Sequence, residues 1–265
     1  MIVLNDVSKS FGKKSVLSHV SLTINPGEFV CVVGPSGAGK STLIHLLIGG
    51  EQVSEGRIEV DGVELRDIPP PVLQLYRRRI GVVFQDYKLI AHRTVAENIA
   101  FPLEVCGVAD AEIDRRVTEL LGQMSLTEKA SSLPDELSGG EKARTAIARA
   151  IVHQPLVLLA DEPTGNLDPV QSLMILKLFQ EIHRSGTTVL VATHDSTLVE
   201  TLQTRVILLE NGKVMRDAAG GYPQQSAKHD LLKEVEKPAV SAQAPVPSAP
   251  SDGSKKKVKV TMIHS

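Results

Sequence analysis

One short stretch, GPSGAGKST at residues 34–42, constrains the fold of this chain more than any other. It follows an apolar, mostly β-branched run (Phe29–Val33) and leads into an apolar, helix-forming run, TLIHLLI. Glycines at these spacings let successive backbone N–H groups turn inward around phosphate, and the start of the following helix adds a partial positive charge. The stretch predicts a strand, a phosphate-binding loop and a helix, with these candidate ligand-binding residues: Gly34, Pro35, Ser36, Gly37, Ala38, Gly39, Lys40, Ser41 and Thr42.

Further apolar runs alternate with helical patterns along the chain. Ser172–Arg184 has helical spacing and is stopped by Gly186, whereas Asp61-Gly62 and Asn211-Gly212 are typical of tight hairpins. This alternation predicts a parallel α/β sheet with some antiparallel sheet beside it. The runs expected to form strands buried on both faces are Phe29–Val33, Ile80–Phe84, Leu156–Ala160 and Thr187–Ala192.

The chain divides into three parts by composition. Residues 1–220 are expected to form one nucleotide-binding domain, with a helical subdomain at about 87–153 where strand signals fade. A short segment at 221–237 follows. Residues 238–265 are rich in Pro, Ala and Ser and then in Lys, and we expect them to be disordered because they cannot bury enough apolar surface. The lysines are interpreted as solvated, with attraction to anionic lipid as the alternative.

Charge and hydropathy exclude several classes of protein. The formal net charge is -2, so a general basic field for nucleic acid is missing and no nucleic-acid partner is expected. We find no apolar stretch of the roughly 18 residues that a spanning helix needs, and no secretory start. We therefore expect the chain to stay in the cytoplasm, with Cys31 and Cys106 as reduced thiols.

Two carboxylates end one of the expected buried strands. Asp161 and Glu162 follow LVLLA, and carboxylates in such a place are costly unless they meet a metal ion or another partner. Beside a phosphate loop, Asp161 and the Ser41 hydroxyl are candidate Mg²⁺ ligands, Glu162 a candidate for polarising the attacking water, and Lys40 a contact for the terminal phosphates. An acid that caps a helix is the other interpretation of this pair.

Three further residues are weaker candidates. Gln85 follows IGVVF and could touch the metal or the attacking water, although a solvated loop glutamine is the alternative. His194 follows TVLVAT and could contact the γ-phosphate, or it could be structural. Phe11 could stack on adenine, or it could be a partly buried aromatic of a β-subdomain.

The expected start of a second helix has the features of a phosphate-binding site. In LSGGEKARTAIARA, residues 137–150, a serine and two glycines precede apolar residues at spacings of three and four. A bare helix start lined by glycine suits phosphate because its N–H groups are free. The sequence therefore predicts two phosphate-binding helix starts in one chain.

The order of motifs resembles the ATP-binding subunit of ABC transporters. The phosphate loop, FQ, LSGGE, ADEP, NLD and ATHD occur in that order over about residues 1–216. The resemblance implies a P-loop NTPase of the ABC ATPase type, with a RecA-like α/β core, an antiparallel β-subdomain and a helical subdomain. It also implies ATP and Mg²⁺ as ligands, and a head-to-tail homodimer in which each ATP lies between the phosphate loop of one copy and Ser138, Gly139 and Gly140 of the other, with Asp168 across the interface.

Two longer sequence segments resemble those of one branch of that family. RRRIGVVFQDYKLIAHRTVAENIAFPLEVCG and LLADEPTGNLDP are similar to the branch that works in bacterial cell division with an integral membrane permease that regulates cell-wall hydrolysis; an ATPase of a lipoprotein-releasing or macrolide exporter is the alternative. The resemblance implies a peripheral protein at the cytoplasmic face of the cell membrane, held there by its partner. A groove for that partner is expected among Leu89, Ile90, Val95, Ile99, Phe101 and Leu103, about half of which could instead be core.

Overall fold

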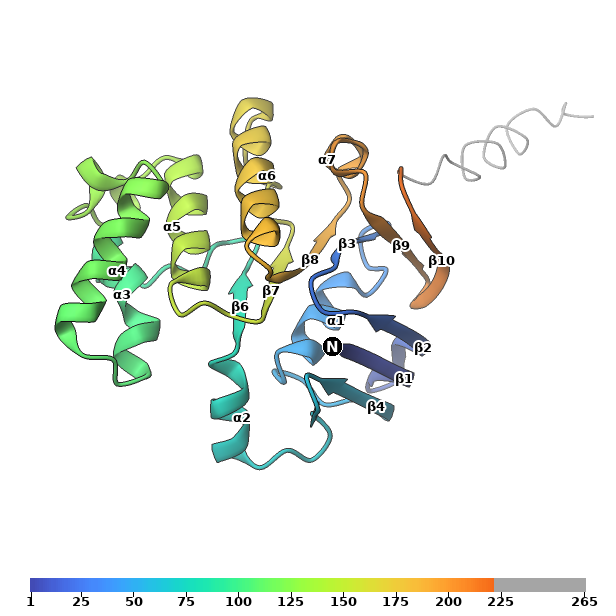
Figure 1. The fold of residues 1–265 in the computed structure, drawn as a ribbon. Coiled ribbons are helices and arrows are strands. Elements are labelled where there is room, and N and C mark those ends of the chain that lie inside the picture. The colour runs from blue at the N-terminus through green and yellow to red at the C-terminus, as the bar shows by residue number, and fades with distance from the viewer. Residues whose placement is uncertain (222–265) are drawn as a thin grey trace, which may run out of the picture. The chain divides into compact units, whose positions relative to one another are not determined.

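The chain contains two sheets, and the larger one includes the strands on either side of the expected site residues. In the computed structural model, which describes residues 1–221, this six-stranded sheet has the order β10-β9-β3-β8-β7-β6 (Figure 1). Its strands run in parallel except for β10, which pairs with β9 in antiparallel register. The strands are β3 (Phe29–Val33), β6 (Ile80–Val83), β7 (Val157–Asp161), β8 (Thr188–Thr193), β9 (Arg205–Glu210) and β10 (Lys213–Ala219).

A smaller antiparallel sheet has the order β2-β1-β4-β5. Its strands are β1 (Ile2–Phe11), β2 (Lys14–Ile24), β4 (Glu55–Val60) and β5 (Val63–Glu64). Asp61 and Gly62 both have positive φ between β4 and β5, as do Asn211 and Gly212 between β9 and β10, which is the conformation that a tight two-residue hairpin requires. Both hairpins predicted from the sequence are thereby confirmed.

Helices cover both faces of the larger sheet. Figure 1 shows α3, α4 and α5 gathered together, away from α1 and the smaller sheet. The helices are α1 (Lys40–Leu47), α2 (Pro70–Arg77), α3 (Val95–Val105), α4 (Asp110–Gln123), α5 (Gly139–Ile151), α6 (Pro169–Arg184) and α7 (Ser196–Leu202), with short 3-10 turns at Thr127–Lys129 and Pro134–Glu136.

Two apolar cores lie on the two faces of β3. Phe29, Cys31 and Val33 belong to the core shared with α3, α5 and α6, whereas Val30 and Val32 belong to the core shared with α1 and the smaller sheet. Alternate side chains of a strand point to opposite faces, so a strand between two layers must be apolar throughout. This explains why these runs contain few polar residues.

The fold class predicted from the sequence is confirmed: the chain has an α/β core with an antiparallel sheet and a group of helices. The four strands predicted from the sequence match β3, β6, β7 and β8 to within one residue at each end. Because β7 extends to Asp161 and β8 to Thr193, the expected site residues begin at the strand ends themselves. The predicted segment 221–237 lies, from residue 222 on, outside the described residues, as does the predicted tail at 238–265. Within the part of the chain that the structure describes, no helix combines the length and apolar character needed to cross a bilayer.

Candidate nucleotide site

The phosphate loop joins β3 to α1 and is pressed against other backbone. A Cβ on Gly34 would stand 2.0 Å from the carbonyl oxygen of Leu209. A Cβ on Gly39, whose φ is 107°, would meet Leu17 and the carbonyl oxygen of Val16. Real Cβ atoms do not approach so closely, so glycine is required at both positions by neighbouring strands as well as by the loop conformation. The loop is therefore shaped by the core before any ligand arrives.

Lys40 is the first residue of α1, and its charged end is turned back into the loop. Its Nζ lies 2.8 Å from the carbonyl oxygen of Gly34 and 3.3 Å from that of Pro35, and the residue is only 7% exposed. Lys40 Nζ is also 3.5 Å from Glu162 Oε1. A buried ammonium that bonds to loop carbonyls is held at the place where the free N–H groups of α1 begin. The charge of Lys40 is thus held at the phosphate loop.

Asp161, at the end of β7, has a buried acceptor atom. Its Oδ1 makes no hydrogen bond to any residue that the structure describes, which is uncommon for a buried carboxylate oxygen. Burial raises the pKa of Asp161, and the charge of Glu162 adds to this, while the Ser41 hydroxyl, His45 and Lys40 act in the opposite direction. An orphaned, partly destabilised carboxylate beside a hydroxyl is the donor set that a hard divalent cation prefers. The residues present therefore fit Mg²⁺.

Glu162 connects the ends of two neighbouring strands. Its Oε2 lies 2.8 Å from His194 Nδ1, just after β8, and its backbone N–H donates to the carbonyl oxygen of Ala192. Glu162 has φ of 46°, a left-handed conformation that costs a non-glycine residue about 1 kcal/mol or more. Such strain is found where surrounding contacts hold a functional side chain in place. Glu162 and His194 also line a hollow of about 480 Å³ that extends between α6 and α7.

Gln85 and Phe11 lie at the margins of this arrangement. Gln85 is two residues beyond the end of β6 and exposed, so it does not end the strand as its sequence position suggested; its carbonyl oxygen accepts from Asn166 Nδ2 at 3.1 Å. Phe11 ends β1 and is 47% exposed, which is more than a partly buried aromatic would be. Lys9, two residues earlier on the same face of β1, places its Nζ 4.6 Å from the centre of the Phe11 ring.

The start of α5 is not bare, which corrects the expectation from the sequence. The Ser138 hydroxyl accepts from the backbone N–H of Glu141, and the Glu141 carboxylate accepts from the backbone N–H and the hydroxyl of Ser138. This capping box satisfies part of the free N–H groups within the chain. Hydrogen bonds from Ser138 hold the pKa of Glu141 below its usual range. The apolar face predicted for this helix is buried as expected, with Ala143, Ala146, Ile147 and Ala150 in the core.

The glycines of α5 also allow close packing against other residues of the same chain. A Cβ on Gly140 would stand 2.1 Å from Gln171 Oε1, and one on Gly139 would stand 3.3 Å from Leu167 Cδ2. Asp168 caps α6, because its Oδ1 accepts from the backbone N–H groups of Val170 and Gln171, both at 2.9 Å. The segment around Asp168 therefore packs closely against the start of α5.

Sequence reasoning missed Glu141, Gln171 and Lys9 as parts of the site's surroundings. Glu141 had a recognisable signal, since a serine followed three residues later by glutamate is typical of a capping box. Lys9 could have been paired with Phe11 through the period of two in a strand. Gln171 had no local signal, because its contact with Gly140 depends on how two helices pack.

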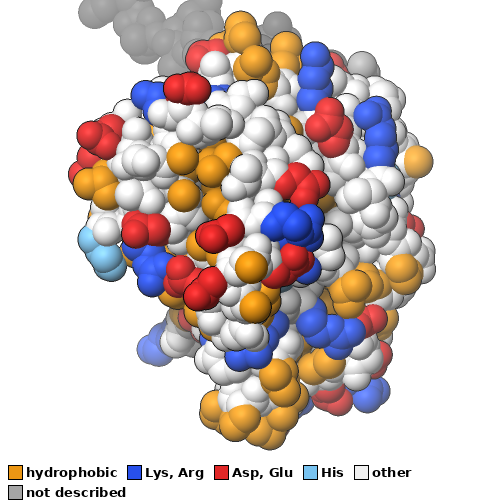
Figure 2. Space-filling view, turned by 60° about the vertical axis from the view of Figure 1, so that its left-hand side comes forward, with side chains coloured by type: hydrophobic (Ala, Val, Ile, Leu, Met, Phe, Trp, Pro, Cys, Tyr) orange, Lys and Arg blue, Asp and Glu red, His pale blue; other side chains and the backbone are white. Residues whose placement is uncertain are grey.

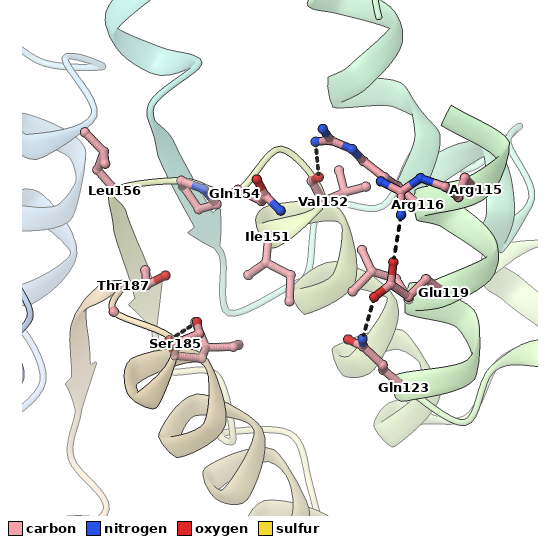
Figure 3. Close-up of a pocket in the computed structure, with 14 residues that line it drawn as sticks. Arg115, Arg116, Glu119, Gln123, Ile151, Val152, Gln154, Leu156, Ser185 and Thr187 are labelled. Atoms are coloured by element: carbon pink, nitrogen blue, oxygen red, sulfur yellow. Dashed lines mark hydrogen bonds and ion pairs between the residues drawn. The ribbon is translucent and has the colours of Figure 1, made fainter. Parts of the chain in front are cut away.

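A second cavity of about 630 Å³ lies at the other end of the sheet (Figure 3). It is lined by α4 residues such as Arg115 and Glu119, by the turn before β7 around Gln154, and by Thr187 before β8. These are the amino ends of parallel strands, whereas ligands in such sheets bind beyond the carboxyl ends. None of the candidate site residues lines this cavity.

The fold and the site together define a P-loop nucleotide-binding protein. The phosphate loop, the acidic residues that follow β7 and the histidine that follows β8 lie at the same edge of a parallel sheet. The family model described as ABC transporter matches residues 17–165. The chain is 50% identical over 222 residues to the cell division ATP-binding protein FtsE of Streptococcus pneumoniae, covering 83% of this chain and 96% of that protein. It is 48% identical over 223 residues to the protein of that name from Bacillus subtilis (83% and 97%), and 45% identical over 213 residues to that from Escherichia coli (80% and 96%).

Two solved structures of the bacterial ABC transporter cassette MJ0796 are also similar. One is described as dimeric, and the other as a dimeric post-hydrolysis state bound to ADP and Pi. They have TM-scores of 0.77 and 0.76 and identities of 36% and 35%, and each match covers 83% of this chain and 98% of the other. The chain belongs to the ABC transporter family and, within it, to the family of cell division ATP-binding proteins. The family predicted from the order of the motifs is confirmed.

Proposed function

We propose that this chain binds and hydrolyses ATP as the ATP-binding subunit of a bacterial cell-division ABC complex. One observation carries the proposal: Lys40 and His194 both contact Glu162 at the carboxyl ends of the parallel strands. Asp161, the residue before Glu162, has a buried carboxylate oxygen with no hydrogen-bond partner among the described residues. Relatives named for cell division at 45–50% identity favour this role over that of a lipoprotein-releasing or macrolide exporter.

Each residue of the site has a distinct task in this proposal. Lys40 and the loop N–H groups stabilise charge that develops on the transferring phosphoryl group, and Ser41, Gln85 and Asp161 would hold Mg²⁺, which supplies further neutralisation of the phosphates when bound. Glu162 accepts a proton from the attacking water. The water oxygen bonds to the γ-phosphorus while the bond between that phosphorus and the bridging oxygen of the leaving ADP breaks. His194 holds Glu162 in position through its contact at 2.8 Å. In this proposal the same imidazole contacts the γ-phosphate when ATP is bound.

The second half of each site comes from a second copy of the chain. The phosphate loop belongs to α1, which packs on β7, β8 and β2, whereas the Ser138 helix start belongs to α5, which packs on α3, β6 and α6. Two copies arranged head to tail bring these two starts together, with Ser138, Gly139 and Gly140 facing the γ-phosphate and Asp168 across the interface. The dimeric cassettes among the similar structures support this arrangement. Loss of the γ-phosphate then removes the contacts that hold the dimer closed.

An FtsX-like integral membrane permease is the proposed partner, through which the chain is held at the cytoplasmic face of the membrane. The groove expected for it lies between α2 and α3, but of the six apolar candidates only Ile90 and Phe101 line it. Val95, Ile99 and Leu103 are core residues and the partly buried Leu89 packs against the core, in line with the expectation that about half of the six would belong to the core.

The Glu162→Gln variant tests the proposed function. It keeps the shape of the side chain but removes the proton acceptor, so we expect ATP binding to persist, hydrolysis to fall by at least about 100-fold, and a closed dimer to accumulate in the presence of ATP. Hydrolysis is measured by phosphate release and self-association by light scattering. Glu200→Gln, an exposed change on α7, is the matched control. An ATP-loaded Glu162→Gln protein that remains monomeric would contradict the head-to-tail mechanism.

A further inference from the structure

Lys9, in β1, is a buried lysine to which the proposed function gives no role. The residue is 8% exposed, whereas the Lys and Arg side chains that Figure 2 shows on one face of the molecule lie at the surface, interspersed with Asp and Glu. A buried ammonium costs free energy unless other groups compensate its charge, so lysines are rarely buried without a partner. The groups around Lys9 therefore indicate what its charge does.

Two acceptor atoms and one aromatic ring surround the ammonium of Lys9. Its Nζ lies 2.8 Å from Glu51 Oε2 and 2.8 Å from the carbonyl oxygen of Gln52. The same Nζ lies 4.6 Å from the centre of the Phe11 ring. An ammonium has three N–H donors, so these acceptors use two of them and the third remains for the face of the ring. The ring therefore takes part in compensating a buried charge.

The two acceptors belong to the segment that follows α1. Glu51 donates its backbone N–H to the carbonyl oxygen of His45, which lies in the last turn of that helix. Further along the segment, Ser54 donates its backbone N–H to the carbonyl oxygen of Ser8, and its hydroxyl accepts from the backbone N–H of Ser10. The segment therefore holds β1 on both sides of the buried lysine and fixes the ammonium relative to α1.

The pair formed by Lys9 and Phe11 lies close to the phosphate loop. β1 and β2 run side by side next to α1 (Figure 1), and in their pairing Lys9 is opposite Leu17. A Cβ on Gly39, in the phosphate loop, would stand 2.6 Å from Leu17 Cδ2. The residue opposite Lys9 therefore borders the loop, and Phe11 lies about 7 Å further along β1 on the same side of the strand.

Phe11 keeps one face of its ring for a ligand. The ammonium covers the other face, and the residue is still 47% exposed. A cation attracts the π electrons of a ring toward itself, which favours the stacking of a flat group rich in π electrons on the opposite face. Nucleobases are such groups, and they stack on aromatic side chains in many proteins. The free face is therefore better suited to a nucleobase than to an aliphatic side chain.

We propose that Lys9 is a positioning residue for the nucleobase: its ammonium fixes the Phe11 ring and strengthens stacking on the free face of that ring. This inference rests on the proposed function, since the base would be the adenine of ATP. Lys9 does not touch the base and acts through Phe11. Because Glu51 and Gln52 follow α1, Lys9 also connects the stacking ring to the helix whose start holds the phosphates.

ADP and pyrophosphate, each with Mg²⁺, test the proposal by titration calorimetry on the full chain. The two ligands carry the same number of phosphoryl groups, so the difference in their affinities measures the contribution of adenosine. We expect the wild-type protein to bind ADP at least about tenfold more tightly than pyrophosphate. Lys9→Met, which keeps the length of the side chain but not its charge, should lower the affinity for ADP by about three- to tenfold and leave that for pyrophosphate within about twofold. Lys9→Arg should retain most of the affinity for ADP, because a guanidinium also stacks on an aromatic ring.

A double-mutant cycle shows whether Lys9 acts through the ring. Phe11→Leu removes the π face but keeps an apolar side chain, and it should lower the affinity for ADP by itself. In that background Lys9→Met should cause no further loss, because no ring is left to hold. Lys177→Met, an exposed change on α6, is the matched control and should leave both affinities unchanged. Lys9→Gln replaces Lys9→Met if the thermal unfolding curve of the latter shows a folding defect, and should give the same selective loss.

Four results would overturn the inference. They are equal losses of ADP and pyrophosphate affinity in Lys9→Met, a Lys9→Arg variant as weak as Lys9→Met, additive losses from Lys9→Met and Phe11→Leu, and equal binding of the two ligands by the wild-type protein. The wild-type titrations separate the inference from the proposed function. A protein that binds both ligands but shows one of these results refutes the role of Lys9 alone, whereas a protein that binds neither ligand refutes the proposed function.

Discussion

Two helix starts of this protein, both proposed to contact phosphate, are built in different ways. α1 begins inside the core, where Lys40 is buried and Gly34 is pressed against the backbone of β9. α5 begins at the surface, where Ser138 is exposed and bonded to Glu141 of its own first turn. The start of α1 is shaped by packing against residues distant in the sequence, whereas the start of α5 is stabilised by capping within its own first turn. Because the start of α5 needs no other part of the chain for its capping and is still exposed, it is suited to contact another molecule.

Gly34→Ala should have the largest effect among changes that test this contrast. Its methyl group would meet the carbonyl oxygen of Leu209 at 2.0 Å, and neither backbone can move without displacing its strand. We expect a loss of about 4 kcal/mol or more in the free energy of unfolding, measured by chemical denaturation. Gly37→Ala is the control, because Gly37 also has positive φ but a Cβ there meets nothing within 4 Å. Equal losses in the two variants would show that loop conformation matters and packing does not.

Lys40→Ala addresses charge in the same loop. Removal of one group that stabilises phosphate typically costs about 3 to 4 kcal/mol in the transition state, so we expect turnover to fall by roughly 100- to 1,000-fold and ATP affinity to drop. Phosphate release and a fluorescent nucleotide titration measure the two effects. Lys177→Ala, on the exposed part of α6, should change neither. Unchanged turnover in Lys40→Ala would exclude Lys40 from catalysis.

The same contrast explains how much could be predicted from the sequence. The phosphate loop has a local pattern, because its strand, glycines and helix are consecutive, and β3 was predicted to the residue. Asp161 and Glu162 could be placed at a strand end by the apolar run before them. The contact between Glu162 and His194 follows from the pairing of β7 with β8, which the alternation of strands and helices suggests but does not specify.

The surroundings of α5 could not be predicted in this way. The contact of Gly140 with Gln171 joins two helices whose relative placement depends on their shared core, and no spacing in the sequence encodes it. The groove candidates had the same difficulty, since apolar residues of α3 such as Ile99 and Phe101 differ in burial only through the side of the helix that the core takes. Local pattern predicts elements and their order, whereas packing decides which face remains available.

Asp161→Asn should have an intermediate effect whose sign depends on metal and pH. Burial raises the pKa of Asp161, so the residue favours the fold while protonated and loses that contribution as pH rises through its raised pKa. Without Mg²⁺ at neutral pH, we expect the variant to be more stable by about 1 to 3 kcal/mol, or a few degrees in Tm. The gain should shrink toward acidic pH, and Mg²⁺ with ATP should stabilise the wild-type protein more than the variant.

Thermal unfolding between pH 5 and 8, with and without MgCl₂, measures this dependence. Asp114→Asn, on the exposed side of α4, is the control and should show no metal-dependent difference. A variant that is less stable than the wild-type protein at neutral pH without metal would contradict the view that Asp161 is an uncompensated carboxylate.

Gly140→Ala should have the smallest effect on stability and the most specific effect on assembly. The added methyl group meets the end of the Gln171 side chain, which can rotate away, and alanine improves helix propensity. We therefore expect the free energy of unfolding to change by less than about 1 kcal/mol. In the Glu162→Gln background, ATP-driven dimerisation should nevertheless be lost, because the methyl group stands at the helix start that the second copy's phosphate must approach.

Gln171→Ala distinguishes the two uses of this glycine. It removes the contact inside the chain, including a hydrogen bond from Arg144 at 3.3 Å, but leaves the start of α5 unobstructed. Dimerisation measured by light scattering should survive Gln171→Ala and fail in Gly140→Ala. If both variants dimerise, Gly139 and Gly140 serve only the packing of α5 against α6. The exposed start of α5 would then not bind the phosphate held by the second copy.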